Sequence, residues 1–349
     1  MDFGQALRQL GRSLCAWLAA CLAWLRKRLH ATASHASDIA AESGGPLGLL
    51  ARLRGMWRAV AFLILALVIA YPLAAWWISI IDDNPDFGVA ANSLKPTQSV
   101  AIANAAALID REVNDYGWTP NDTFLWPTVL LDNMPNYQMG MLTALSHFAT
   151  TLASTDPQNS DLKEAAELLQ YPPDVWVWQP SASLWPASSE HKYNNAIEAL
   201  TRYNAGLLTG TAHFDVRAGT LKAILARIGT DFDQASTSID SRISNRSGFL
   251  FINNKADDVF YTSKGELYAY YILLKGTERD FAGVIKDRGL AQNWRRMMES
   301  LHAGIGLRPW FVLNAEPDSQ FVPCVLCSEG FYLLRARAEM QDIANRLAK

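Results

Sequence analysis

The sequence predicts a mainly α-helical protein with one transmembrane helix. Residues 59–81 form an apolar run without a single charged side chain. Beyond residue 97, apolar residues recur at helical spacing in segment after segment. Half of the 349 residues are hydrophobic, so the chain can bury a substantial core. We expect an N-terminal amphipathic helix, a membrane span and a helical domain whose loops are rich in proline and tryptophan.

The first segment, 1–30, is predicted to be an amphipathic helix. Its apolar residues recur at alternating steps of four and three, at Phe3, Leu7, Leu10, Leu14, Trp17, Cys21 and Trp24. The uncharged part is short for a bilayer span, and basic residues follow it at 26–28. We therefore expect the helix to lie on the anionic inner leaflet, while its spacing leaves open a pairing with another helix.

The segment 31–58 is predicted to be a flexible linker flanked by basic residues, because 31–48 is small, polar and glycine-bearing. Up to residue 58 the chain has eight basic and three acidic residues, a net charge of +5. The remainder has 23 basic and 31 acidic residues, a net charge of -8. This asymmetry predicts that the N-terminus is cytoplasmic and that the acidic body lies on the other side of the membrane.

The span at 59–81 is predicted to be a single transmembrane helix. Its 23 residues give roughly 34 Å of helix, enough for the hydrocarbon layer of a bilayer. A buried core helix is the first alternative, but the run has no polar face. A cleaved signal peptide is the second, but 58 residues precede the run, which favours an uncleaved anchor.

Beyond the span we expect a short stalk at 82–96 and a helical body at 97–349. Helices are predicted at 99–117, 136–154, 188–210, 214–244, 264–287, 290–304 and 328–349. Gly117 is expected to end the first of them. Residues 248–263 have the β-branched and aromatic runs of a hairpin, so one short hairpin is left open.

The stretch "TPNDTFLWPTVLLDNMPNYQMGM" raises the question of an active-site loop. Its polar residues near prolines are typical of helix starts, where a side-chain oxygen accepts from free backbone N–H groups. We therefore interpret Thr119, Asp122 and Asn133 as helix caps rather than as catalytic residues.

Four motifs carry a family resemblance: "AYPLAAWWISIIDDNPDF", "ALIDREVNDYGWTPND", "LLDNMPNYQMG" and "EGFYLLRARAEM". With them the sequence resembles domain of unknown function family 2333, from the membrane span to the C-terminus. The resemblance implies a membrane-anchored protein of the bacterial envelope and no catalytic residues. With the charge asymmetry, it predicts a single-pass inner-membrane protein with a periplasmic body.

Tryptophans gather in the loops and helix starts of the body, at Trp118, Trp126, Trp176, Trp178, Trp185 and Trp310. Rings at a pocket rim could stack on sugars or grip a peptide. The interpretation that we favour is that they close the ends of the helical core.

Cys324 and Cys327 are the only cysteines beyond the span, so we predict that they form a disulfide in an oxidising compartment. Their position before a helix leaves open a redox role, and a local clamp is favoured. Cys15 and Cys21 are expected to be free thiols.

The sequence predicts no catalytic residue, cofactor or metal. The histidines lack any two-ligand helical spacing, and no nucleophile elbow or phosphate loop is present. Glu299 followed by serine resembles the catalytic pair of lytic transglycosylases, but the rest of that signature is missing. Glu112 and Asp115, beside Arg111, are expected to form a solvated charged face.

We therefore expect a non-catalytic binding or scaffold protein of the envelope. Its expected partners are the lipid bilayer and another envelope protein, and peptidoglycan is left open. The acidic body argues against nucleic acid. The alternative is a peptidoglycan-acting enzyme or a carbohydrate-binding module that uses the aromatic loops.

Overall fold

The computed structural model describes residues 27, 46–123, 132–176, 187–244, 254–309, 312 and 324–348. The chain divides into two compact units, Met1–Ala74 and Ala75–Lys349, and each is described by itself. All regular secondary structure in the described residues is helical, so the predicted mainly α fold is confirmed.

The helix α2, Pro46–Ile78, begins in the first unit. From Arg54 onward it is long and apolar enough to cross a membrane, and Ala75 is its only buried residue in that part. Pro72 lies inside α2 without ending it, as transmembrane helices tolerate. By length and composition, this helix agrees with the predicted span.

The start of α2 differs from the predicted linker at 31–58. Pro46 is its first residue, where proline is favoured because its missing N–H would have no helical partner. The end of the predicted linker is therefore helical. The amphipathic helix predicted at 1–30 lies outside the described residues, apart from Lys27.

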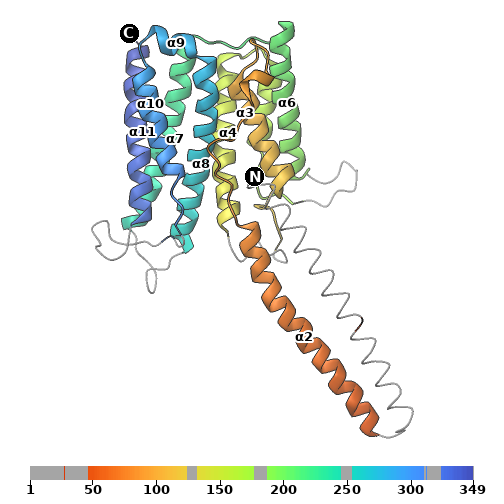
Figure 1. The fold of residues 1–349 in the computed structure, drawn as a ribbon. Helices are drawn as coiled ribbons and strands as arrows, with labels where there is room; N and C mark the ends of the chain where they lie inside the picture. Colours follow the sequence, from red (N-terminus) through yellow and green to blue (C-terminus); the bar gives the residue numbers. More distant parts are fainter. Residues whose placement is uncertain are drawn as a thin grey trace. The chain divides into compact units, whose positions relative to one another are not determined.

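The second unit is a bundle of antiparallel helices (Figure 1). Its elements are η1 (Ala91–Ser93), α3 (Val100–Asp110), the π-helical η2 (Arg111–Gly117), α4 (Asn133–Thr155), α5 (Ser160–Leu169), α6 (Ser189–Thr209), α7 (Ala218–Ser244), α8 (Asn254–Asp280), α9 (Ala282–Asp287), α10 (Ala291–Ile305) and α11 (Val325–Leu347). We call the end where α4, α6, α8 and α11 begin the near end. The opposite end, where α3 begins and α6 and α8 end, is the far end.

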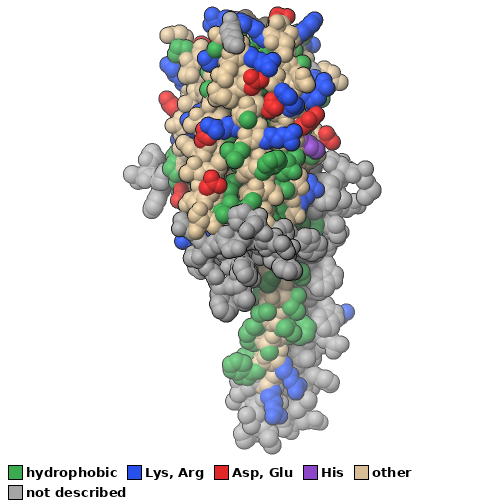
Figure 2. Space-filling model, turned by 90° about the vertical axis from the view of Figure 1, so that its left-hand side faces the viewer, with side chains coloured by type: hydrophobic (Ala, Val, Ile, Leu, Met, Phe, Trp, Pro, Cys, Tyr) green, Lys and Arg blue, Asp and Glu red, His purple; other side chains and the backbone are tan. Residues whose placement is uncertain are grey.

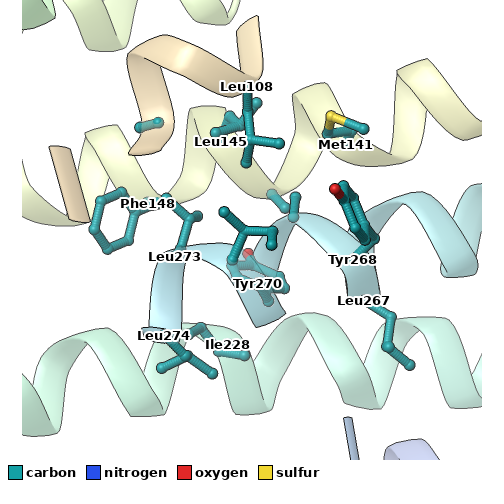
Figure 3. Close-up of a cluster of buried hydrophobic side chains, with 14 of the residues drawn as sticks. Leu108, Met141, Leu145, Phe148, Ile228, Leu267, Tyr268, Tyr270, Leu273 and Leu274 are labelled. Carbon is teal, nitrogen blue, oxygen red and sulfur yellow. The ribbon is translucent and has the colours of Figure 1, made fainter. Parts of the chain in front are cut away.

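The helix α8 lies at the centre of this unit and packs against α3, α4, α7, α10 and α11. Its sequence "LYAYYILL" is apolar on every side, which only a surrounded helix can satisfy. Figure 3 shows Leu273 beside Phe148 of α4, and Leu274 beside Ile228 of α7. The core is therefore built in layers on both sides of α8.

Two glycines let α4 and α8 approach closely. A Cβ atom at Gly140 would lie 1.9 Å from the carbonyl oxygen of Thr262. A Cβ atom at Gly265 would lie 2.0 Å from the carbonyl oxygen of Tyr137. Any larger residue at either position must push the two helices apart.

Helix ends follow ordinary capping chemistry. Ser99, Asn159 and Ser188 cap α3, α5 and α6, each accepting a backbone N–H three residues on, at 3.1, 3.0 and 3.3 Å. Gly117 ends η2 with a φ of 87°, as predicted, and Gly210 follows α6 with a φ of 76°.

Residues 82–96, the predicted stalk, are part of the body. Lys275 of α8 donates to the carbonyl oxygen of Pro85 at 2.6 Å, and the N–H of Val89 donates to Asn104 Oδ1 of α3 at 2.8 Å. The segment has the polar and proline-bearing composition of a linker, but buried side chains satisfy its backbone.

The predicted hairpin at 248–263 is wrong in the part that the structure describes, because α8 begins at Asn254. Ala256 and Phe260 are fully buried one turn apart on this helix. Packing therefore overrides the β preference of the aromatic and β-branched residues. The helix α5 is not among the predicted ones.

Candidate functional site

A groove of about 720 Å³ opens at the far end of the body. It is lined by residues 94–100, by Leu207, by Ala212, His213, Phe214 and Val216, and by Arg279, Asp280 and Ala282. Its volume lies within the range of ligand-binding sites. Four separate stretches of the chain thus converge on one concave surface.

Asp280, the last residue of α8, forms part of the wall. Its Oδ2 accepts from Ser99 Oγ at 2.6 Å and from the N–H of Ala101 at 3.1 Å, and its Oδ1 accepts from the N–H of Val100 at 2.8 Å. Burial raises the pKa of Asp280, although these hydrogen bonds oppose the shift. The carboxylate is therefore already engaged at the start of α3, where the helix dipole favours negative charge.

Asn204 of α6 binds the backbone at the start of α3 from the side opposite Asp280. Its side chain accepts from the N–H of Ser99 at 2.9 Å and donates to the carbonyl oxygen of Ser99 at 3.1 Å. Gly276 brings α3 against α8, because a Cβ there would lie 2.5 Å from backbone atoms of Ala101. The walls of the groove are thus fixed before any ligand arrives.

The other ionisable side chains of the lining are basic. Lys95, His213 and Arg279 are all exposed. Among the described residues, no ion pair includes Lys95 or Arg279. Asp215, next to the lining, is paired with the guanidinium of Arg217 at 2.8 Å. The groove therefore combines apolar walls with cationic side chains that have no ion pair in the described part of the chain.

At the near end, residues 82–87 are held firmly, and we call this segment the clamp. Tyr116 Oη donates to Asp82 Oδ2 at 2.7 Å, and Tyr137 Oη donates to the carbonyl oxygen of Asp82 at 3.2 Å. Tyr268 Oη donates at 2.9 Å to the carbonyl oxygen of the residue two positions after Asp82. Tyrosines from three helical elements thus fix the chain soon after α2 ends.

Asp83 is the charged centre of the clamp. Its Oδ2 lies 2.8 Å from Lys264 Nζ, and Arg308 also pairs with it. Lys264 Nζ further donates to the carbonyl oxygens of Ile305, at 3.1 Å, and Leu307. Burial would raise the pKa of Asp83, but Arg308 and Lys264 outweigh it and hold that pKa below its ordinary value. Burial lowers the pKa of Lys264.

A second buried network surrounds η2. Arg111 donates to Glu112 Oε1 at 2.9 Å and to Tyr268 Oη at 2.9 Å, and Gln138 Nε2 donates to Glu112 Oε2 at 3.1 Å. Arg111 and Glu112 are only 5% and 3% exposed, so the solvated face expected for them is wrong. Their charges compensate each other inside the core.

A third polar cluster joins α4, α7 and α8. Asp231 is paired with Arg227, accepts from Tyr270 Oη and lies 3.1 Å from His147 Nδ1. Burial and the charge of Asp231 raise the pKa of nearby Glu266 to about 8. A carboxylate behind an imidazole could serve acid–base chemistry. However, Arg227 Nη2 lies 2.8 Å from His147 Nδ1 and 3.2 Å from its Nε2, which makes the cluster an internal network.

The predicted aromatic residues differ in position. Trp118 is 7% exposed, donates from Nε1 to the carbonyl oxygen of Pro173 at 2.8 Å and packs edge-on against Tyr193. Trp176, by contrast, is 54% exposed. Trp126, Trp178, Trp185 and Trp310 lie outside the described residues.

The predicted caps need correction. Thr119 donates its N–H and hydroxyl to Gln138 Oε1, at 2.9 and 2.8 Å, and the described residues after it form a turn. Asn133 is the first residue of α4, so the cap position belongs to Asp132, whose side chain makes no cap hydrogen bond. For Asp122 the cap stays a prediction, because the chain just after it lies outside the described residues.

Cys324 and Cys327 have disulfide geometry at the start of α11, with Cα atoms 5.2 Å apart. Their pairing in the cell stays a prediction, which alkylation of non-reduced membranes tests. Cys15 and Cys21 lie outside the described residues. Glu299 is exposed on α10. In the part of the chain that the structure describes, no group of three or more His, Cys, Asp or Glu could hold a metal.

In its described residues the protein is all-α, with one helix apolar enough to span a membrane and a basic, partly apolar groove at the far end of its bundle. The chain belongs to a bacterial family described as uncharacterized protein conserved in bacteria (DUF2333), whose family model matches residues 51–248. The predicted resemblance is confirmed, although its last motif lies beyond the matched range. No curated protein and no solved structure matches the chain.

Proposed function

We propose that this protein is a single-pass protein of the bacterial inner membrane whose periplasmic body binds another envelope protein without catalysing a reaction. The excess of basic residues before the apolar stretch and the acidic body support this topology. Trp57 and Trp76 are 67% and 60% exposed near the two ends of that stretch, where tryptophan suits the membrane interfaces.

The observation that carries this proposal is the short connection between the apolar stretch and the clamp. The second compact unit starts at Ala75, inside the apolar stretch that ends at Ile78. Five residues further on, Asp83 is buried in its ion pair with Lys264, so an extended chain would span at most roughly 18 Å between them. A body that begins so few residues after its anchor is suited to holding a partner close to the membrane.

Exposed apolar side chains support contact between the near end and lipid. Trp176 precedes α6 at this end and is 54% exposed. On α11, Phe331 and Leu334 are 58% and 51% exposed. On the face of the body that Figure 2 shows, hydrophobic side chains gather in the part nearer the near end. Lys and Arg prevail in the part nearer the far end. Aromatic and aliphatic groups of this kind favour the bilayer interface.

Binding is favoured over catalysis by the chemistry of the groove. A glycosidase needs a carboxyl group free to exchange protons with its substrate. The carboxylate in this groove, Asp280, instead accepts three hydrogen bonds that shape the wall. Basic and apolar groups in a preformed concavity are typical of recognition.

Trp176 keeps a second candidate function open. Its exposed ring could stack on a sugar, as a carbohydrate-binding module of the envelope requires. Binding of purified peptidoglycan by the full-length protein, lost on Trp176→Ala, would favour that function. Unchanged binding by Trp176→Ala would remove it.

Topology is tested first, by fusing alkaline phosphatase after Lys349 of the full-length protein. The proposal predicts an active fusion, because the enzyme matures only in the periplasm. A fusion of a cytoplasmic reporter at the same position should be inactive. The opposite pattern would overturn the assigned compartment.

Partner binding is tested by cross-linking in intact cells, followed by quantitative pull-down from solubilised membranes. The full-length protein should enrich an envelope protein that a control with the body removed after Ile81 does not. Equal enrichment by both forms would show that the body does not bind a partner.

A further inference from the structure

We propose that the far-end groove binds an acidic polypeptide segment that carries an apolar side chain. This inference rests on the proposed function and names the chemistry of its partner. It follows from the charges, the walls and the location of the groove.

The charge of the groove is the first argument. Lys95 and Arg279 line it, are exposed and have no ion pair among the described residues. The nearby carboxylates are already engaged, Asp280 by the start of α3 and Asp215 by Arg217 and a threonine hydroxyl. The groove therefore presents two exposed cationic side chains against the single carboxylate of its lining, and neither cation is held in an ion pair by a described residue. Carboxylates of a partner are complementary to these cations.

The walls supply the second argument. Leu207 and Phe214 are mainly buried parts of the lining, and Val216 is 47% exposed beside them. Phe214 packs edge-on against Phe281, with ring centroids 5.7 Å apart, so its ring is held in place. An apolar side chain that enters the groove would remove these surfaces from water. A free phosphate or a small dicarboxylate would leave them uncovered.

The location of the groove distinguishes a polypeptide from a lipid, which also combines negative charge with apolar groups. The clamp contacts α8 at Lys264, whereas the groove contacts it at Arg279. Fifteen helical residues separate the two, or roughly 22 Å at about 1.5 Å per residue. The groove therefore lies at the opposite end of the bundle from the segment that follows the apolar stretch. This separation favours a segment of a periplasmic protein over lipid of the bilayer, and the binding test below compares the two.

The walls are also organised in advance. Ser99 is fixed by Asn204 on one side and by Asp280 on the other, all within 3.1 Å. Rigid walls reduce the entropy lost on binding, which matters for a groove that takes a flexible segment. The occupant is therefore expected to order itself while the groove stays unchanged.

The test uses full-length protein in nanodiscs of phosphatidylcholine and three pools of short synthetic peptides. All pools contain leucine and phenylalanine, and their remaining residues are acidic, neutral or basic. The acidic pool should be retained preferentially, and raising the salt concentration should weaken retention. Equal retention of the three pools, or none of the acidic one, would overturn the proposal. So would preferential binding of short-chain phosphatidylglycerol over the acidic peptides.

Variants locate the binding. Lys95→Glu and Arg279→Glu together should weaken acidic-peptide affinity at least about tenfold, since both charges then repel the ligand. Ala282→Trp should block the groove without changing charge. The matched control is Lys286→Glu, an exposed lysine of α9 outside the lining. An equal loss in the control would show that net charge, not the groove, attracts the peptide.

The outcome is distinguishable from that of the proposed function. If the body captures an envelope protein that still binds the Ala282→Trp variant, the scaffold function stands and the groove assignment fails. If the alkaline phosphatase fusion is inactive, the compartment is wrong whatever the groove binds in vitro.

Discussion

Lys264 and Asp83 form an ion pair of 2.8 Å in which the two side chains are only 4% and 5% exposed. The pair joins the central helix α8 to the clamp that follows the apolar helix. Because isolated buried charges are strongly unfavourable, each residue depends on the other for its charged state. The pair therefore makes the clamp an obligatory part of the folded body.

Removing one member of this pair should strongly destabilise the fold. We expect Lys264→Met to lower the free energy of unfolding by about 3–5 kcal/mol, because Asp83 would be left buried beside fewer positive charges. Lys264→Met combined with Asp83→Leu should recover much of the loss. Thermal unfolding of the full-length protein in nanodiscs measures both.

The control for this series is Arg337→Ala. Arg337 pairs with Asp233 at 2.7 Å, but both are nearly half exposed, so the change should be within about 1 kcal/mol. An equal effect of Lys264→Met and Arg337→Ala would contradict the clamp.

Close packing of α4 and α8 predicts opposite effects for two kinds of glycine. Gly140→Ala and Gly265→Ala should each lower the melting temperature, because the new Cβ atoms would overlap backbone atoms of the facing helix. Gly229→Ala, in α7 with nothing within 4 Å of its Cβ, should stabilise by about 0.5–1 kcal/mol. Destabilisation by all three to the same extent would argue against this packing.

The raised pKa of Glu266, to about 8, predicts a pH-dependent stability. Between its ordinary value of 4.5 and about 8, the folded protein keeps a proton that the unfolded chain has lost. Its contribution is thus complete below pH 4.5 and is lost as the pH rises through 8. The groups around it are Asp231, Arg227, Tyr270 and the buried Glu329 of α11. Asp231 has a lowered pKa and stays ionised across this window.

Melting curves from pH 5 to 9 test this directly. The melting temperature of the wild type should fall more over this range than that of Glu266→Gln, because glutamine at this position cannot release a proton. Glu299→Gln, at an exposed position, should follow wild type. If the melting temperatures of wild type and Glu266→Gln depend on pH in the same way, the pKa of Glu266 is not raised in the folded protein.

Capping chemistry predicts a contrast between two asparagines. Asn159 caps α5, so Asn159→Ala should destabilise by about 0.5–2 kcal/mol. Asn133 Oδ1 is buried and has no hydrogen-bond partner among the described residues, so Asn133→Ala should be neutral or stabilising. Denaturant unfolding compares the two. A larger loss for Asn133→Ala would restore the cap predicted from the sequence.

Much of the fold follows from local patterns. The run at 59–81 and the helical spacing of the body predict helices close to those observed, because burial of a helix face imposes a period on the sequence. Gly117 marks a helix end for an equally local reason. The sequence of residues 82–96 suggests a stalk because their partners, such as Lys264 and Lys275, are more than 180 positions away.

The candidate site could not be predicted for the same reason. Asp280 ends α8 and would pass for a solvated residue, yet it accepts hydrogen bonds from the start of α3. Lys95 and Arg279 line the same groove only because tertiary folding brings distant parts of the chain together. Arg111 and Glu112 suggest a charged surface until tertiary packing buries them. Pairings of this kind have no signature in a single sequence.

We propose that the clamp holds the body close to the membrane, and lipid-borne quenching tests this in the full-length protein. With Cys15 and Cys21 replaced by serine, a fluorophore is attached at Trp176→Cys, at the near end, or at Gly283→Cys, at the far end. Nanodiscs then carry lipids with a nitroxide on the headgroup, which quenches only at short range. We predict strong quenching at position 176 and none at position 283. Equal quenching at both positions, or none at either, would contradict this proposal.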